Sequence, residues 1–102
     1  MIDFVEKHRQ AIDRLCRLHD VERLTLFGSA NDGSFDPARS DVDFLVSLRT
    51  ADAIAHKRSY VGLKESLSDL LGCKVDLLTE RSIVNRRFRE SIEANKTLLY
   101  AA

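Results

Sequence analysis

The sequence has few of the residues that would build a zinc-binding framework, and it lacks the net positive charge of a polyanion-binding surface. Its two cysteines, Cys16 and Cys73, are isolated, and none of its three histidines lies at a ligand-like spacing from them, so we expect no zinc site. Both cysteines are predicted to be reduced core or surface residues. Sixteen basic and sixteen acidic residues cancel, which argues against a general polyanion binder or a membrane-surface protein.

Long apolar runs are missing as well. No stretch approaches the ~20 apolar residues needed to span a bilayer. The N-terminal residues MIDFVEKHRQ meet charge at the third position and lack the apolar region of a signal peptide. The sequence therefore predicts a cytoplasmic protein without membrane contact. Because there is no linker, repeat or low-complexity tract, residues 1–102 are expected to form one domain.

Hydrophobic periodicity predicts an α/β protein with the element order α-β-β-α-β-α. Helices are expected over residues 2–18, 52–71 and 80–95, and strands over 21–28, 41–48 and 73–79. Within the last helix, Val84, Phe88 and Ile92 repeat at four-residue steps. Residues 96–102 fit either a final strand or a docking tail. The function must then lie on one layered α/β structure.

Two aspartates stand inside an apolar run, although uncompensated carboxylates are costly to bury. In a strand over "DVDFLV", Asp41 and Asp43 share one face, whereas Val42 and Phe44 take the core face. Two such side chains, about 6–7 Å apart along the strand, can converge on a divalent cation such as Mg²⁺. Asp76, inside the strand "KVDLL", can bring a third carboxylate to the same edge.

Each of these signals also has an ordinary interpretation. A D-x-D pair is commonly a surface feature, and Gly-Ser before a polar loop is commonly a turn. Because Gly28 and Ser29 follow a strand, their backbone N–H groups and the serine hydroxyl could instead hold a triphosphate. The segment is neither a Walker A loop nor a dinucleotide fingerprint, and no G-x-S-x-G elbow of a hydrolase is present.

In combination, these motifs resemble the nucleotidyltransferase superfamily that includes DNA polymerase β. The resemblance is greatest to its small prokaryotic members, the minimal nucleotidyltransferases. It is carried by "LTLFGS", by Gly33 in the following loop, by "SDVDFLV", and by Asp76 in "KVDLL", and it covers nearly the whole chain. It implies a polymerase β-like fold, with a short mixed sheet packed against helices, and a transfer of AMP from ATP.

The resemblance also implies roles for individual residues. Asp41 and Asp43 would ligate two Mg²⁺ ions, and Asp76 would ligate one of them and help to activate the incoming hydroxyl. Gly28 and Ser29 would contact the nucleotide. These five assignments describe a two-metal phosphoryl-transfer site, whose ions stabilise both the attacking and the leaving oxygens.

The polar loop differs from the family pattern. Where family members commonly have arginines, this chain has Ala30 and Asp32, which weakens the case for tight triphosphate binding. Arg39 is a candidate to compensate. Ser40 fits the family's "SD" step, either as a donor supporting the aspartate or as a plain turn residue.

Small members of this family are often encoded with a HEPN-domain ribonuclease toxin, and the resemblance implies an antitoxin that transfers AMP to a toxin tyrosine. We therefore expect a homo- or hetero-oligomer. The alternative is a catalytically weak or inactive module that neutralises its toxin by binding alone. Full retention of the three carboxylates favours the enzyme, and the missing arginines favour the alternative.

The C-terminal region carries a basic cluster of Arg86, Arg87 and Arg89. No aromatic stacking platform accompanies these arginines, so direct nucleic-acid binding is not expected. We predict instead that the partner protein docks on an apolar and basic surface that also includes Phe88 and Tyr100.

Overall fold

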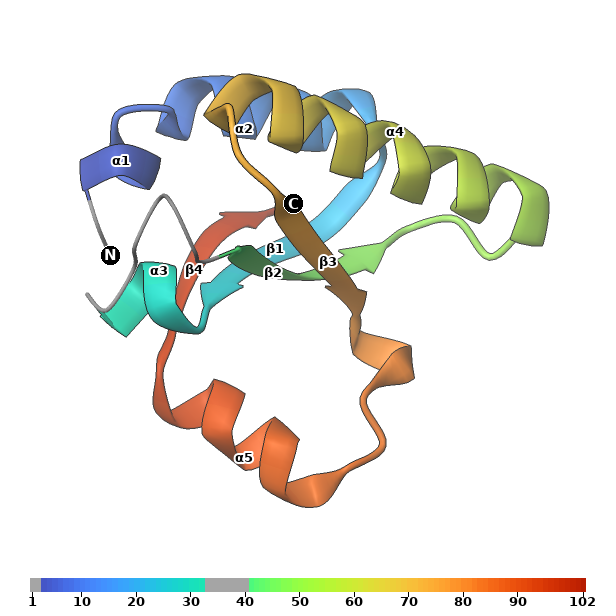
Figure 1. Cartoon of the computed structure of the whole chain (residues 1–102). Helices are drawn as coiled ribbons and strands as arrows, with labels where there is room; N and C mark the ends of the chain where they lie inside the picture. Colours follow the sequence, from blue (N-terminus) through green and yellow to red (C-terminus); the bar gives the residue numbers. More distant parts are fainter. Residues whose placement is uncertain (1–2, 33–40) are drawn as a thin grey trace.

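A four-stranded sheet forms the centre of the chain, which a computed structural model describes over residues 3–32 and 41–102 (Figure 1). In chain order, the strands are β1 (Val21–Phe27), β2 (Val42–Leu48), β3 (Val75–Thr79) and β4 (Lys96–Ala101). They lie side by side in the order β3-β2-β1-β4. The sheet is mixed, because β2 pairs with β3 in parallel while β1 pairs with β2 and β4 in the antiparallel sense.

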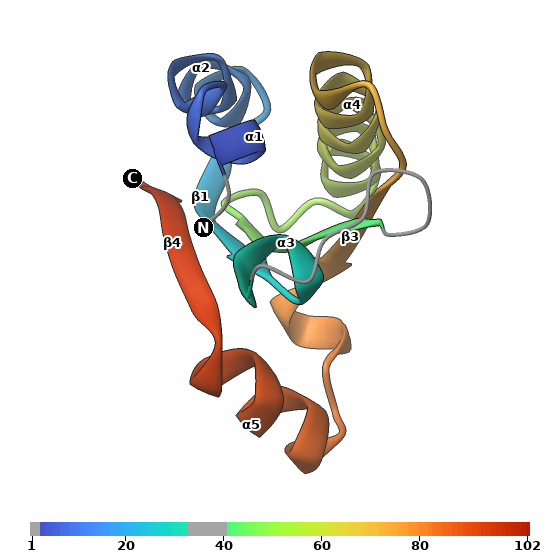
Figure 2. The same ribbon diagram turned by 60° about the vertical axis from the view of Figure 1, so that its left-hand side comes forward.

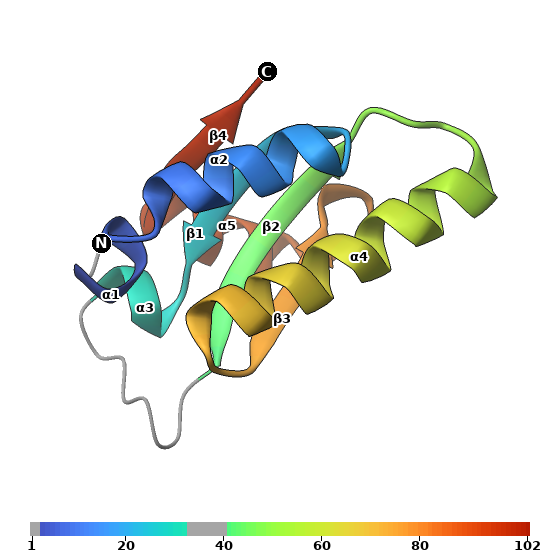
Figure 3. The same cartoon turned by 90° about the horizontal axis from the view of Figure 1, so that it is seen from above.

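Helices cover both faces of this sheet. They are α1 (Asp3–Glu6), α2 (Arg9–Leu18), α3 (Ser29–Asp32), α4 (Ala53–Leu71), the 3₁₀ turn η1 (Glu80–Ser82) and α5 (Arg86–Ala94). The pair α2 and α4 lies on one face, with α5 on the other (Figures 1 and 2). Seen from above, α2 and α4 run side by side over the strands (Figure 3). The predicted polymerase β-like fold is confirmed, and the C-terminal residues add a last strand.

Local signals set the ends of α4 and the start of α5. The Asp52 carboxylate accepts a hydrogen bond from the Ile54 N–H at 3.2 Å and so caps the start of α4. Gly72 ends the same helix in the left-handed conformation, with φ +67°. At α5, the Asn85 side chain accepts from the Phe88 N–H at 3.0 Å. These caps satisfy backbone groups that the helix ends leave unpaired.

Two predicted helices are wrong in extent. The N-terminal one is interrupted at Lys7 and His8, where the His8 backbone leaves helical geometry between α1 and α2. The C-terminal one begins at Arg86 and not at residue 80, because Asn85 caps it there and η1 occupies the preceding residues. Val84 therefore lies outside α5 and is 92% exposed. Of the three apolar residues expected at four-residue steps along this helix, only Phe88 and Ile92 lie on it.

The core has two parts, separated by the sheet. The larger part lies under α2 and α4 and includes Phe44, Leu63 and Leu67, all fully buried. The smaller part lies under α5 and consists of Phe27, Leu45, Ile83 and Ile92, with Leu78 packed against it.

Among the described residues, no helix combines the length and the hydrophobicity needed to cross a membrane.

Candidate functional site

Two of the predicted acidic residues are neighbours on adjacent strands. Asp43 in β2 lies opposite Asp76 in β3 in the parallel register, and opposite Phe27 in β1. Because Val42 and Phe44 are fully buried on the α2/α4 face, Asp43 projects from the face that α5 covers in part. Asp76 lies on that same face, between the buried Val75 and Leu77. Strand spacing places the two Cα atoms about 4.8 Å apart.

This proximity changes the acid strength of Asp43. Burial, followed by the charges of Asp76 and Asp41, raises the pKa of Asp43 to about 6. All three causes disfavour a negative charge at this position. A bound cation would relieve each of them, and carboxylate oxygens are the ligands that Mg²⁺ prefers.

The third carboxylate faces a lysine. Asp41 lies one residue before β2, and its Oδ2 is 3.7 Å from the Lys74 Nζ. Within residues 3–32 and 41–102, no three His, Cys, Asp or Glu side chains are grouped closely enough to hold a metal ion. The donor chemistry of Asp43 and Asp76 fits Mg²⁺. Asp41 can join them only if its side chain turns away from Lys74.

Gly28 closes the site from the β1 side. It has φ +75°, a conformation that glycine adopts without a steric penalty, and a Cβ at this position would overlap Asp43 Oδ2. Glycine is therefore required twice, by the turn and by the neighbouring carboxylate. The short helical turn predicted after Gly28 is present as α3, which begins at Ser29. The Asn31 N–H donates to the Gly28 carbonyl at 3.0 Å. Ser40, Gly33 and Arg39 lie outside the described residues.

A hydrogen-bonded clamp holds α3 against the C-terminal part of the chain. The Asn31 Nδ2 donates to the Asn95 Oδ1 at 2.6 Å, and the Thr97 hydroxyl donates to the Asn31 Oδ1. Asn95 ends α5 and Thr97 lies in β4. Sequence reasoning missed this clamp, because its members are 64 and 66 residues apart and no local pattern links them.

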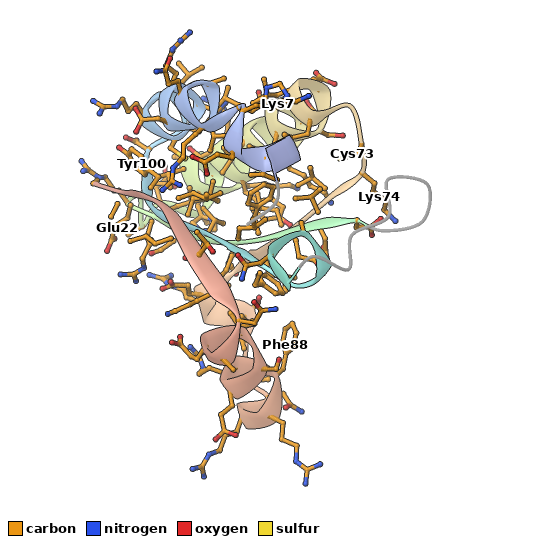
Figure 4. The ribbon with its side chains drawn as sticks, turned by 90° about the vertical axis from the view of Figure 1, so that its left-hand side faces the viewer. Lys7, Glu22, Cys73, Lys74, Phe88 and Tyr100 are labelled. Atoms are coloured by element: carbon orange, nitrogen blue, oxygen red, sulfur yellow. The ribbon has the colours of Figure 1, made fainter. Side chains whose placement is uncertain are left out.

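The predicted partner surface is divided by the sheet. Phe88 is 40% exposed and packs edge-to-face on Phe27, with ring centroids 6.1 Å apart, on the α5 side. Tyr100 instead packs against the larger core, on the side of α2. Figure 4 shows Phe88 below the sheet and Tyr100 near α2. Including Tyr100 in one surface with Phe88 was therefore wrong, because the strand separates the two side chains.

Comparisons with known proteins bear on the family and the fold of the chain. The nucleotidyltransferase domain family matches residues 8–99. The "Putative protein adenylyltransferase MJ0128" of Methanocaldococcus jannaschii is 33% identical over 92 residues, which are 89% of this chain and 86% of the relative. A second protein of that organism with the same description, MJ1379, is 32% identical over 91 residues.

Solved structures give the same result. A "putative minimal nucleotidyltransferase" superposes with a TM-score of 0.68 at 29% identity, covering 94% of this chain and 95% of its own. A chain in the crystal structure of a toxin-antitoxin with AMP-PNP has a TM-score of 0.68 at 26% identity, covering 92% and 73%. A structure of tri-AMPylated Shewanella oneidensis HEPN toxin with MNT antitoxin matches with 0.64 at 23% identity, covering 95% and 72%, which is a likeness of fold.

Proposed function

The chain belongs to the nucleotidyltransferase domain family, and from this membership we propose that it transfers AMP from ATP to a hydroxyl group of a partner protein. The observation that carries the proposal is the pairing of Asp43 with Asp76 on adjacent strands, next to the Gly28 turn. This arrangement places two carboxylates side by side, with the backbone of Gly28 close to the Asp43 carboxylate.

We assign the carboxylates to two Mg²⁺ ions, with Asp43 and Asp76 as ligands and Asp41 joining them once it has left Lys74. Two such ions supply charge stabilisation to the attacking and leaving oxygens of an in-line displacement. The fit rests on the neighbouring positions of the Asp43 and Asp76 carboxylates on β2 and β3, whose oxygens are of the kind that Mg²⁺ prefers. Burial, and then the charges of Asp76 and Asp41, raise the pKa of Asp43, which is in keeping with a position where a cation is favoured.

The protein's own groups would orient the substrates. Gly28 and Ser29 would contact the triphosphate at the start of α3, and Ser40 would support the neighbouring Asp41. Asp76, whose residue is exposed, would accept the proton of the incoming hydroxyl. The hydroxyl oxygen then bonds to the α-phosphorus, and the bond to the departing pyrophosphate breaks.

A protein acceptor is proposed because the matched relatives carry the description of protein adenylyltransferases. One structural neighbour comes from a structure of a tri-AMPylated HEPN toxin in complex with an MNT antitoxin. By this analogy, the acceptor is a tyrosine of a HEPN-type ribonuclease toxin, and the chain acts as an antitoxin in a complex with it. The surface that we propose for docking is formed by the exposed Val84, just before α5, and by Arg86 and Phe88 on α5.

A second function, neutralisation of a toxin by binding alone, is favoured by two observations. Asp41 is paired with Lys74, and among the described residues the three carboxylates are not grouped closely enough to hold a metal ion. In addition, the described start of the polar loop has Ala30 and Asn31 without a basic residue. Both features weaken nucleotide binding without affecting a docking surface.

Nucleotide binding is expected to depend on Mg²⁺. Without the metal, the triphosphate would approach three carboxylates of like charge, so isothermal titration calorimetry should detect ATP binding with Mg²⁺ and little or none in excess chelator. The Asp76→Asn variant serves as a control, because it should bind less tightly in Mg²⁺. Equal affinity in the two buffers would count against the proposed site.

The α3 clamp is expected to affect nucleotide affinity. Thr97→Val keeps the shape of the side chain but removes the hydroxyl that donates to Asn31, so we expect Mg²⁺-ATP to bind about fivefold more weakly, in line with one lost hydrogen bond. Thr97→Ser retains the donor and should bind as the wild type does. Steady-state kinetics should show the change in KM for ATP. A Thr97→Val protein with normal KM and only a lower Tm would show that the clamp is purely structural.

A further inference from the structure

Lys74 lies just before β3, beside Asp41 of the proposed site, and sequence reasoning gave it no role. We propose that it is a mobile cation of the site, pairing with Asp41 when no metal is bound and turning to the phosphate oxygens of the nucleotide when metal occupies the carboxylates. This inference rests on the proposed function and adds a positioning residue for the triphosphate.

The backbone of Lys74 is held by a hydrogen bond, whereas its side chain is mostly exposed. The Lys74 carbonyl accepts a hydrogen bond from the Val42 N–H at 3.0 Å, which ties the residue to the start of β2. The side chain is 80% exposed, and Nζ lies 3.7 Å from the Asp41 Oδ2, beyond hydrogen-bond distance. Figure 4 shows it reaching outward at the start of β3. An exposed pair of this kind is weak, so little free energy opposes its separation.

In the proposed site, Asp41 cannot fully serve both Lys74 and a metal ion. Asp41 must release the ammonium group before it can ligate metal with Asp43. The released ammonium then lies beside a triphosphate with several negative charges. Its flexible four-carbon stem and three donors suit it to bind phosphate as a point charge.

Charge balance supplies the second argument. The part of the polar loop that the structure describes, Ala30 to Asp32, contributes no positive charge. Among the ion pairs of the described residues, Lys74 is the cation that contacts a carboxylate of the proposed site. Lys74 precedes β3 and is therefore placed to supply, from outside the loop, the positive charge that the start of the loop lacks.

The sequence contained a signal for this role. Lys74 and Asp76 are two residues apart, and residues at that spacing share a face of an extended segment. The spacing alone could not show that the lysine pairs with Asp41, because that contact depends on β2 and β3 lying side by side.

The test measures two binding constants that should change in opposite directions. In Lys74→Gln, Mg²⁺ alone should bind up to about fivefold more tightly, because Asp41 has lost its competing partner. Mg²⁺-ATP should bind about tenfold more weakly, because a charged phosphate contact is lost. Lys74→Arg should restore nucleotide affinity. Lys64→Gln is the matched control: this exposed lysine lines the same surface hollow of about 370 Å³, and its loss should change neither constant.

The outcomes separate the inference from the proposed function. If the wild type binds Mg²⁺-ATP and Lys74→Gln leaves both constants unchanged, or shifts both in the same direction, the inference is overturned and the proposed function stands. If the wild type binds Mg²⁺ but no ATP, the proposed function fails and the inference fails with it. Opposite shifts in Lys74→Gln, absent in Lys64→Gln, support the inference.

Discussion

Replacing Asp43 with asparagine is expected to lower the rate of AMP transfer by more than ~100-fold while the protein remains folded. Changes to groups that merely support a metal ligand typically cost ~10–100-fold, and Asp43 is assigned as a ligand itself. It is the central carboxylate of the three, because it lies opposite Asp76 and because the charges of both Asp76 and Asp41 act on it. Transfer should be measured with labelled ATP and the partner protein, at saturating Mg²⁺.

The same substitution should stabilise the protein when metal is absent. The folded pKa of Asp43, about 6, exceeds that of a free aspartate, about 3.9, so the folded state binds this proton more tightly. Stability of the wild type in chelator should therefore fall as pH rises from about 4 to 6 and level off above that. Asp43→Asn should lack this decline and gain about 1 kcal/mol at pH 7, since solvent screens part of the effect. Urea unfolding at several pH values measures it.

Two companion variants complete the test of Asp43. Asp41→Asn and Asp76→Asn should lose transfer in the same way. Because the three groups act as a unit, a double substitution should cost little more than a single one. A structural role for Asp43 predicts the reverse pattern, a lower Tm with unchanged transfer, and full activity in Asp43→Asn would end the catalytic interpretation.

Replacing Gly28 with alanine is expected to cost both stability and activity. An alanine at φ +75° is strained by about 1–2 kcal/mol. Its Cβ would also overlap Asp43 Oδ2, so the carboxylate must move. A shift of about 1 Å in a reacting group can cost ~100-fold in rate, and we expect a loss of that size.

Gly72→Ala provides the matched control for this experiment. Gly72 has a similar φ of +67°, but a Cβ there would meet nothing within 4 Å. It should lose comparable stability and keep normal transfer, so the difference between the two variants isolates the contact with Asp43. If Gly28→Ala lowers Tm as Gly72→Ala does and transfers AMP at the wild-type rate, the contact has no catalytic meaning.

Local patterns predicted much of the fold. The alternation of acidic and apolar residues over residues 41–44 predicted the buried face of β2, and the structure places Val42 and Phe44 there with no exposure. Gly72 was correctly placed as a left-handed helix end. Both results depend on interactions within a few residues, which a single sequence displays. The extent of α5 was wrong because a cap at Asn85 competed with a helical pattern that began earlier.

Contacts between distant strands were beyond such reasoning. That Gly28 is needed to accommodate Asp43 follows from the register of β1 against β2, in which Phe27 lies opposite Asp43. The placement of Tyr100 away from Phe88 likewise depends on which face of β4 meets α2. Hydrophobic periodicity predicts that a strand has two faces, and only the assembled sheet shows what each face contacts.

The most direct test of the proposed function is the intact mass of the partner protein after incubation with ATP and Mg²⁺. With the wild-type chain, the partner should gain the mass of one or more adenylyl groups, mapped to tyrosine, and with Asp43→Asn it should gain none. A partner that binds the wild-type chain and loses its toxic activity, yet gains no adenylyl mass, would contradict AMP transfer and establish neutralisation by binding alone.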